Sequence, residues 1–338
     1  MSARNSVSRK RFSSDVAVIS YIAGIKLVLQ LAAINGYGYF RDEFYYIACS
    51  QNPAFGYVDH PPLAMLLLRI IRTVLGESII SLRIVPALCG FLFVFLTGLI
   101  ARELGGKKFA VLLASAAALA PVGNFFMHFY YSMNALDHLF WLGCVYVLIK
   151  IVKTGNDRLW ILFGLLAGLG LQNKISILFL GFGLVDRDAY KYRLFGWMFL
   201  SIFILFMLQH AKDYYLSGVY PIVFAAGGVQ FERWLSRMRW GGIKTVLVVL
   251  VLMFAILLAP MALPILPIDM YVDYANKVGV SGVQGENHEF GVLPQHYADM
   301  FGWEEIVSEA GRVFNTLSPE EKKACPMRTT IPFSSAGG

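Results

Sequence analysis

The sequence predicts an all-α polytopic membrane protein, and three observations support this fold class. Hydrophobic residues make up 57% of the chain, charged residues only 15%, and the mean hydropathy is +0.59. In soluble domains, charged residues alone make up about a quarter of the chain. Apolar runs of about 17 to 25 residues, long enough to cross a bilayer as helices, recur along the sequence. Short basic clusters separate these runs, as topology signals do in membrane proteins.

The apolar runs and basic clusters predict about nine crossings, with the N-terminus in the cytoplasm and the C-terminus outside. The basic residues between Arg4 and Arg11 set the first orientation. The run Ile175–Val185 is the exception in length, because about eleven residues cannot cross about 30 Å as a helix. The expected spans are about Val16–Ile34, Ile79–Ala101, Phe109–Met127, Ala135–Val152, Leu159–Leu171, Ile175–Val185, Leu194–Leu208, Tyr215–Val229 and Thr245–Ile268.

Two parts of the chain follow from this topology. Residues 1–268 are expected to form the transmembrane bundle, with the first outer loop at residues 36–78. Residues 269–338 are expected to form a small segment on the outer face, too short for a large domain. Ser318, with Glu321 three positions later, predicts a helix that begins with a capping box in this segment.

Charge and cysteine content argue against several other classes of protein. The net charge of +7 comes from clusters between apolar runs, which argues against nucleic-acid binding. The four cysteines show no CxxC spacing, so neither a metal site nor a disulfide framework is expected. No metal or other cofactor is expected, and membrane lipids are the expected surroundings.

The first outer loop concentrates charge, aromatic residues and turn residues between apolar runs. It contains Arg41, Asp42 and Glu43, followed by several tyrosines and phenylalanines, and closes with Asp59 and His60 before two prolines. Proline suits the first turn of a helix, where its missing N–H costs nothing. In residues 63–74 the large apolar side chains then lie on one side of a predicted helix and Arg69 and Arg72 on the other, as in a helix on a membrane surface.

The expected topology brings the polar residues of several loops to one membrane face. Two acids and two lysines there would suit a lipid-linked phosphate, because lysines neutralise phosphate oxygens and an acid can deprotonate an attacking hydroxyl. The residues are Asp42, Glu43, Asp59, His60, Asn134, Asp137, His138, Lys174, His210, Lys212 and Asp213.

Each of these residues also has a plainer interpretation. Asp42 or Glu43 can pair with Arg41, and Asp137 can cap its helix. Lys174 and Lys212 can snorkel from the ends of their spans. The histidines lack metal-ligand spacing, which favours a structural or hydrogen-bonding role over a metal site.

The sequence resembles a known family in several motifs that occur in the family's order. The stretch GYFRDEFYYIACSQNPAFGYVDHPPL is similar to the first outer loop of bacterial glycosyltransferase family 39, which includes relatives of protein O-mannosyltransferases and the lipid A aminoarabinose transferase. MNALDHLFW, LGLQNK and KDYYLSGVYPIVFAAGGV support it. The resemblance covers about Asn35–Gly183, Leu194–Trp234 and a tail containing LPQHYADMFGWEE.

The resemblance implies a fold, a location and a reaction. The fold would be a GT-C-type transmembrane helix bundle in the bacterial inner (plasma) membrane. The enzyme would transfer a hexosyl or pentosyl group from a polyprenyl-phosphate-linked donor to a lipid, glycan or protein acceptor. Transfer would invert the anomeric centre and occur on the outer, periplasmic face.

The resemblance also implies roles for residues at matching positions. Asp42 would be the catalytic base, and Asp137 a second acidic residue on the acceptor side. Lys174 and Lys212 would contact the donor phosphate. The other substrate-binding residues would be Glu43, Tyr45, Tyr57 and His60.

Two departures from the family pattern suggest a shortened protein. Relatives have further spans and a loop between the positions of Gly183 and Leu194, so an internal deletion is expected at this point. Beyond Lys323 the chain diverges from the relatives, which continue into an outer domain, so a truncated C-terminus is expected. Alternatives to an active enzyme are therefore a lipid-linked substrate transporter or flippase, and a non-catalytic membrane remnant. A transporter would place charges at mid-depth and show inverted repeats.

Overall fold

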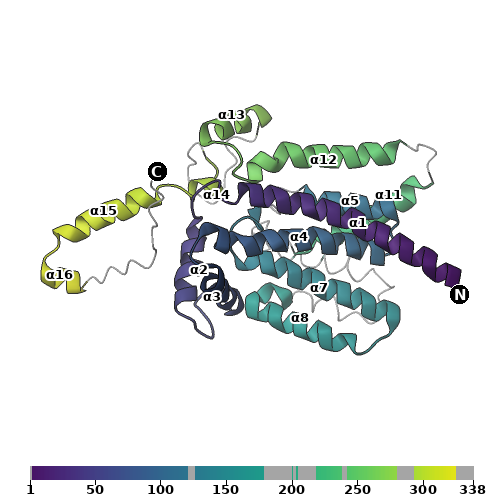
Figure 1. Ribbon diagram of the computed structural model, residues 1–338, viewed down its shortest axis with the longest axis horizontal. Helices are drawn as coiled ribbons and strands as arrows, with labels where there is room; N and C mark the ends of the chain where they lie inside the picture. Colours follow the sequence, from purple (N-terminus) through teal and green to yellow (C-terminus); the bar gives the residue numbers. More distant parts are fainter. Residues whose placement is uncertain are drawn as a thin grey trace.

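The computed structural model describes residues 2–120, 126–178, 200, 203–204, 218–237, 242–279 and 293–324. All regular elements within these ranges are helices, so the predicted all-α class is confirmed. Long helices run side by side, and short helices lie across one end of the bundle (Figure 1).

Four helices in the described ranges are long and apolar enough to cross a membrane. They are α1 (Ser2–Ala33, apolar from Ser14), α4 (Ile79–Glu103), α7 (Met133–Thr154) and α12 (Ile243–Ala262). They coincide with the first, second, fourth and ninth expected spans. The chain is therefore a polytopic membrane protein, as predicted.

The other expected spans are shorter or lie outside the described residues. The third and fifth correspond to the shorter apolar helices α5 (Lys108–Leu119) and α8 (Leu159–Asn173), and α11 (Tyr220–Leu235) covers most of the eighth. The short sixth run begins as a 3-10 helix, η1 (Ile175–Leu178). The rest of it, and nearly all of the seventh, lie outside the described residues. The count of about nine crossings stays a prediction.

Helix α4 lies at the centre of the bundle, packed against α1, α5, α7 and α11 (Figure 1). Small residues allow this close approach. A Cβ atom on Gly98 would lie 2.5 Å from Ser115 Oγ of α5, and one on Gly228 of α11 would lie 2.7 Å from the Ala110 carbonyl oxygen. Contacts between small residues are a common way for membrane helices to pack tightly, because lipid provides no hydrophobic drive for association.

One end of the bundle gathers ion pairs from three helices. Glu103, at the end of α4, lies 2.6 Å from Lys153 Nζ and 3.4 Å from Lys150 Nζ of α7. Arg102 pairs with Asp15 of α1 at 3.4 Å. The basic residues at the end of α4 and at the end of α7, which were expected on one membrane side, therefore do lie together. Their cytoplasmic orientation stays a prediction.

Short helices make up the opposite end of the molecule and the tail. They are α2 (Arg41–Gln51), α3 (Leu63–Leu75), α13 (Ile268–Val278), α14 (Gln295–Ala298), α15 (Trp303–Thr316) and α16 (Pro319–Ala324). The predicted helix after the two prolines is α3. It buries Met65 and Leu68 and leaves Ile70 and Val74 exposed. The predicted capping box at the start of α16 is confirmed, with the Ser318 amide donating to Glu321 Oε2 at 2.8 Å. A domain boundary at residue 268 stays a prediction.

Candidate functional site

Helix α2 begins at the acidic pair, which places both carboxylates in its first turn. Phe40, just before the helix, has an extended backbone, and its amide donates to Glu43 Oε2 at 2.9 Å. Acidic side chains in the first turn are favoured by the partial positive charge of a helix N-terminus. The local sequence therefore begins α2 at Arg41 and holds Asp42 at the end of the bundle opposite the Glu103 ion pairs.

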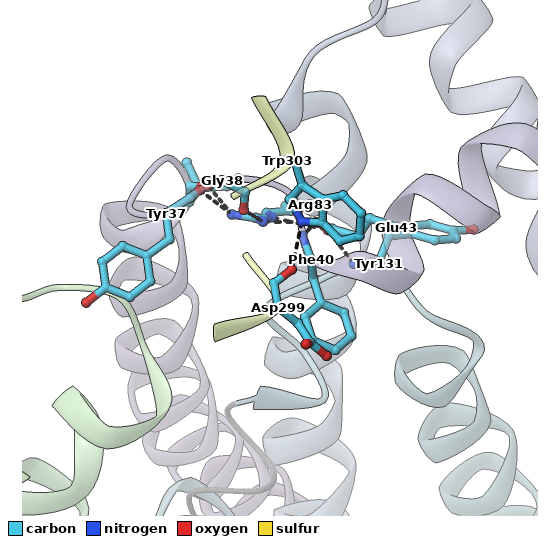
Figure 2. A network of polar contacts seen from close by, with 9 residues as sticks. Tyr37, Gly38, Phe40, Glu43, Arg83, Tyr131, Asp299 and Trp303 are labelled. Carbon is cyan, nitrogen blue, oxygen red and sulfur yellow. Dashed lines mark hydrogen bonds and ion pairs between the residues drawn. The ribbon is translucent and has the colours of Figure 1, made fainter. Parts of the chain in front are cut away.

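Glu43 is fully buried and forms an ion pair with Arg83 of α4 (Figure 2). Arg83 donates to both Glu43 oxygens, at 3.2 Å from Nε and 2.9 Å from Nη2. The Tyr131 amide donates to Glu43 Oε1 at 2.9 Å. The remaining Arg83 donors reach the carbonyl oxygens of Ile34 and Gly38, at 3.0 and 2.7 Å. These contacts tie α2 to α4 and to the loops after α1 and before α7.

Asp42, in contrast, points toward solvent and keeps a looser contact. Its side chain is 47% exposed, and Oδ1 lies 3.3 Å from Arg41 Nε. Arg41 Nη1 also lies 3.3 Å from Asp299 Oδ2, in the tail. Of the two neighbouring acids, Asp42 is thus the one that an incoming molecule can reach.

Aromatic residues and His60 form a cluster beside α2. His60 stacks on Tyr46, with ring centroids 5.3 Å apart, and lies 5.5 Å from the Tyr45 ring. Tyr57 fastens the loop, since its hydroxyl donates to the Cys49 carbonyl at 3.0 Å and its amide donates to the His60 carbonyl at 2.9 Å. Within the described residues, His60 Nδ1 is buried and has no hydrogen-bond partner.

A second polar group lies where α7 faces the end of α8. Lys174 Nζ donates to Asn134 Oδ1 at 2.7 Å and lies 3.9 Å from Asp137 Oδ2. Ser176 Oγ lies 2.7 and 2.8 Å from the two Asp137 oxygens, and Trp141 Nε1 donates to Ser176 at 3.4 Å. The i, i+3, i+4, i+7 spacing of Asn134, Asp137, His138 and Trp141 predicts one shared face of the helix. The contacts of Asn134, Asp137 and Trp141 agree with this prediction, and those of His138 do not.

Electrostatics links the two groups through His60. Burial lowers the pKa of His60; the charges of Asp59 and Asp42 raise it, and the charge of Lys174 lowers it further. His60 is thus within electrostatic range of both Asp42 and Lys174. The fold brings the predicted base and a predicted phosphate ligand to one neighbourhood.

His138 contacts a different set of residues. Its Nδ1 lies 3.2 Å from His128 Nε2, and His128 Nδ1 lies 3.4 Å from Lys26 Nζ of α1. Phe93 packs against both histidine rings. The polar face of α7 therefore divides, and His138 faces the interior of the bundle.

Most of the predicted site residues lie near His60 or near Lys174, and one lies outside the residues that the structure describes. Asp42, Tyr45, Tyr57 and His60 surround the α2 end, and Asp137 and Lys174 lie at the α7 end. Glu43 is near them but has its carboxylate occupied within the core. Lys212 lies outside the described residues. In the described ranges, no cluster of three His, Cys, Asp or Glu side chains could hold a metal.

Sequence analysis missed Arg83, Ser176 and Asp299. A charged residue inside an apolar span is a signal for Arg83, because such a residue needs a buried partner. Asp299 lies in a motif that was noted only for its family resemblance. For Ser176 we find no distinguishing signal in the sequence, because its importance comes from its place beside Asp137.

Comparison with known proteins agrees with the resemblance of the first loop. The family described as dolichyl-phosphate-mannose-protein mannosyltransferase matches residues 59–190, which is less than half of the chain. The matched range includes His60, Asp137 and Lys174 and begins after Asp42. No curated protein matches the chain significantly.

A solved structure with some similarity is the Archaeoglobus fulgidus oligosaccharyltransferase, tethered by a disulfide to an acceptor peptide containing the NVT sequon. The identity is 17%, the TM-score is 0.41, and the alignment covers 88% of this chain and 44% of the archaeal chain. The chain thus spans less than half of that structure's length, and so low a score carries no argument about function. Residues 59–190 of this chain are thus similar to the dolichyl-phosphate-mannose-protein mannosyltransferase family, which agrees with the resemblance seen in the sequence motifs.

Proposed function

We propose that the protein transfers a sugar from a polyprenyl-phosphate-linked donor to an acceptor hydroxyl on the outer membrane face, with inversion. The observation that carries this proposal is the arrangement at this end of the bundle, where Asp42 is exposed on the helix that contacts His60 and Lys174 is oriented by Asn134. An exposed carboxylate and a lysine at the same end of the bundle are suitable for combining base catalysis with phosphate binding.

The proposed reaction is a single displacement. Asp42 takes the proton of the acceptor hydroxyl, and the acceptor oxygen attacks the anomeric carbon of the donor. The bond between this carbon and the phosphate oxygen breaks, and polyprenyl phosphate leaves. Attack opposite the leaving group inverts the anomeric centre.

The chain's residues would divide this work. Lys174 would neutralise the leaving phosphate, with its side chain already oriented by Asn134. Lys212 would be a second phosphate ligand. Asp137 is buried beside Lys174 and Ser176, so we assign it the orientation of Lys174 and the acceptor side of the pocket. Tyr45 and Tyr57 would shape the pocket around His60, and Glu43 would support it from the core.

The test is transfer from radiolabelled polyprenyl-phosphate donors in membranes that contain the wild-type chain or its Asp42→Asn variant. We expect loss of a catalytic base to reduce transfer by about 10² to 10⁴-fold. Asp157→Asn, an exposed acid between α7 and α8, is the matched control and should keep full activity.

Two results would contradict the proposal. Transfer that is unchanged in Asp42→Asn would remove the base from the mechanism. No transfer by a well-inserted wild-type chain, over a panel of donors and acceptors, would favour a non-catalytic remnant. Movement of a labelled polyprenyl phosphate across vesicles by that same chain would favour a flippase.

A further inference from the structure

The tail segment Leu293–Trp303 packs directly on the residues that begin α2. The Arg41 amide donates to the Asp299 carbonyl oxygen at 3.1 Å, and the Trp303 and Phe44 rings meet edge to face at 5.0 Å. A Cβ atom on Gly38 would lie 2.6 Å from the Met300 carbonyl oxygen, so the two backbones are in close contact. The tail segment therefore packs against the first turn of α2 (Figure 2).

Asp299 also forms an ion pair with Arg41, the side chain that contacts Asp42. The Arg41 guanidinium lies between two carboxylates, 3.3 Å from Asp42 Oδ1 and 3.3 Å from Asp299 Oδ2. The Asp299 side chain is only 20% exposed, against 47% for Asp42. Arg41 Nε donates a hydrogen bond to Asp42, whereas Asp299 Oδ2 is buried without a hydrogen-bond partner within the described residues, so its contact with Arg41 is an ion pair only. Because a partly buried pair is screened less by water, this ion pair still attracts Arg41 toward the tail.

The sharing of Arg41 between Asp42 and Asp299 matters because Asp42 is the proposed base. A guanidinium that binds a carboxylate through two of its three nitrogen atoms occupies both oxygen atoms that would accept a proton. Asp299 pairs with Nη1 of Arg41, so Arg41 contacts Asp42 through Nε and orients its carboxylate without binding both oxygen atoms. A displacement of about 1 Å in a reacting group can cost about a hundredfold in rate.

We propose that Asp299 is a positioning residue of the site, which acts through Arg41 to fix the direction of Asp42. This inference rests on the proposed function. It assigns to the C-terminal segment a part in the site that it builds with the first outer loop.

The first test is a double-mutant cycle on sugar transfer with Asp299→Asn, Arg41→Met and the two combined. We expect Asp299→Asn to lower kcat about tenfold while the donor KM stays within about twofold, because Asp299 orients the base and does not touch the donor. The double variant should be no slower than Arg41→Met alone, since Asp299 acts through Arg41. Asp299→Glu should recover most of the rate. Glu305→Gln removes an exposed acid from the same tail and should change nothing.

The second test needs no activity. Hydrogen exchange of the peptide amides at residues 38–46 reports how firmly the tail holds the first turn of α2. We expect Asp299→Asn to speed this exchange at least about fivefold and Glu305→Gln to leave it unchanged. Arg41→Met should speed it by a similar factor, with little further effect in the double variant.

The outcomes separate this inference from the proposed function. Additive losses of kcat in the cycle, or unchanged transfer by Asp299→Asn beside an inactive Asp42→Asn, would overturn the positioning role. Unchanged exchange in Asp299→Asn would overturn the hold on α2. If no variant transfers sugar, the proposed function fails, and the exchange cycle still decides whether Asp299 fixes α2 through Arg41.

Discussion

Breaking the ion pair between Glu43 and Arg83 should destabilise the protein more than replacing both partners together. Both side chains are fully buried, and two hydrogen bonds join them, at 3.2 and 2.9 Å. Arg83→Met would leave the Glu43 carboxylate buried without its counter-charge, and Glu43→Gln would leave the guanidinium in the same state. Removing one partner of a buried pair costs about 3–5 kcal/mol.

The double variant Glu43→Gln with Arg83→Met removes both charges, so its cost should be smaller than the sum of the two. Some loss remains, because the carbonyl oxygens of Ile34 and Gly38 lose their donors. Each unmet buried acceptor costs about 1–3 kcal/mol. We therefore expect a double-variant loss of about 2–6 kcal/mol, smaller than the sum of about 6–10 kcal/mol for the two single variants.

The assay is unfolding of the purified chains in detergent, followed by circular dichroism. Glu77→Gln is the control, because Glu77 is 48% exposed and pairs with Arg72 at 2.7 Å. An exposed pair of this kind is worth about 1 kcal/mol or less. Additive losses in the double variant, or a loss in either single variant no larger than that of the control, would refute the reasoning.

Three further predictions concern the tail, the bundle and the site. Burial lowers the pKa of His296 from 6.5 to about 4, so the fold favours the neutral ring. This contribution to stability is complete above pH 6.5, and up to about 3 kcal/mol of it is lost as the pH falls toward 4. The difference in melting temperature between the wild type and His296→Phe should therefore shrink as the pH falls, and a constant difference would contradict this. Gly98→Leu should destabilise the bundle by at least about 1–3 kcal/mol, whereas Gly164→Leu, which meets open space, should not, as thermal unfolding in detergent would show. Lys174→Met should raise the donor KM about tenfold or more, because a charge on the donor phosphate loses its partner, and an unchanged KM in the transfer assay would remove Lys174 from the donor site.

The sequence alone determined the class of the protein and the start of its site. Apolar runs and basic clusters are local patterns, and the bilayer thickness converts them into helices of known length. Helix α2 was not predicted, because the stretch before the two prolines was expected to be a loop. Asp42, His60 and Lys174 could still be selected before any contact was known, because the expected topology and the family resemblance both point to them.

Only the tertiary structure decided how the two acids of the first loop differ. Glu43 and Asp42 are neighbours with the same charge, and nothing in their spacing separates them. Helix packing places Glu43 against Arg83 in the core and leaves Asp42 beside Arg41 at the surface. Such pairs join residues far apart in the chain, so they depend on which helix faces meet and not on a local repeat. The same reason hid Asp299, because its partner on α2 is defined only once the tail has folded back on the bundle.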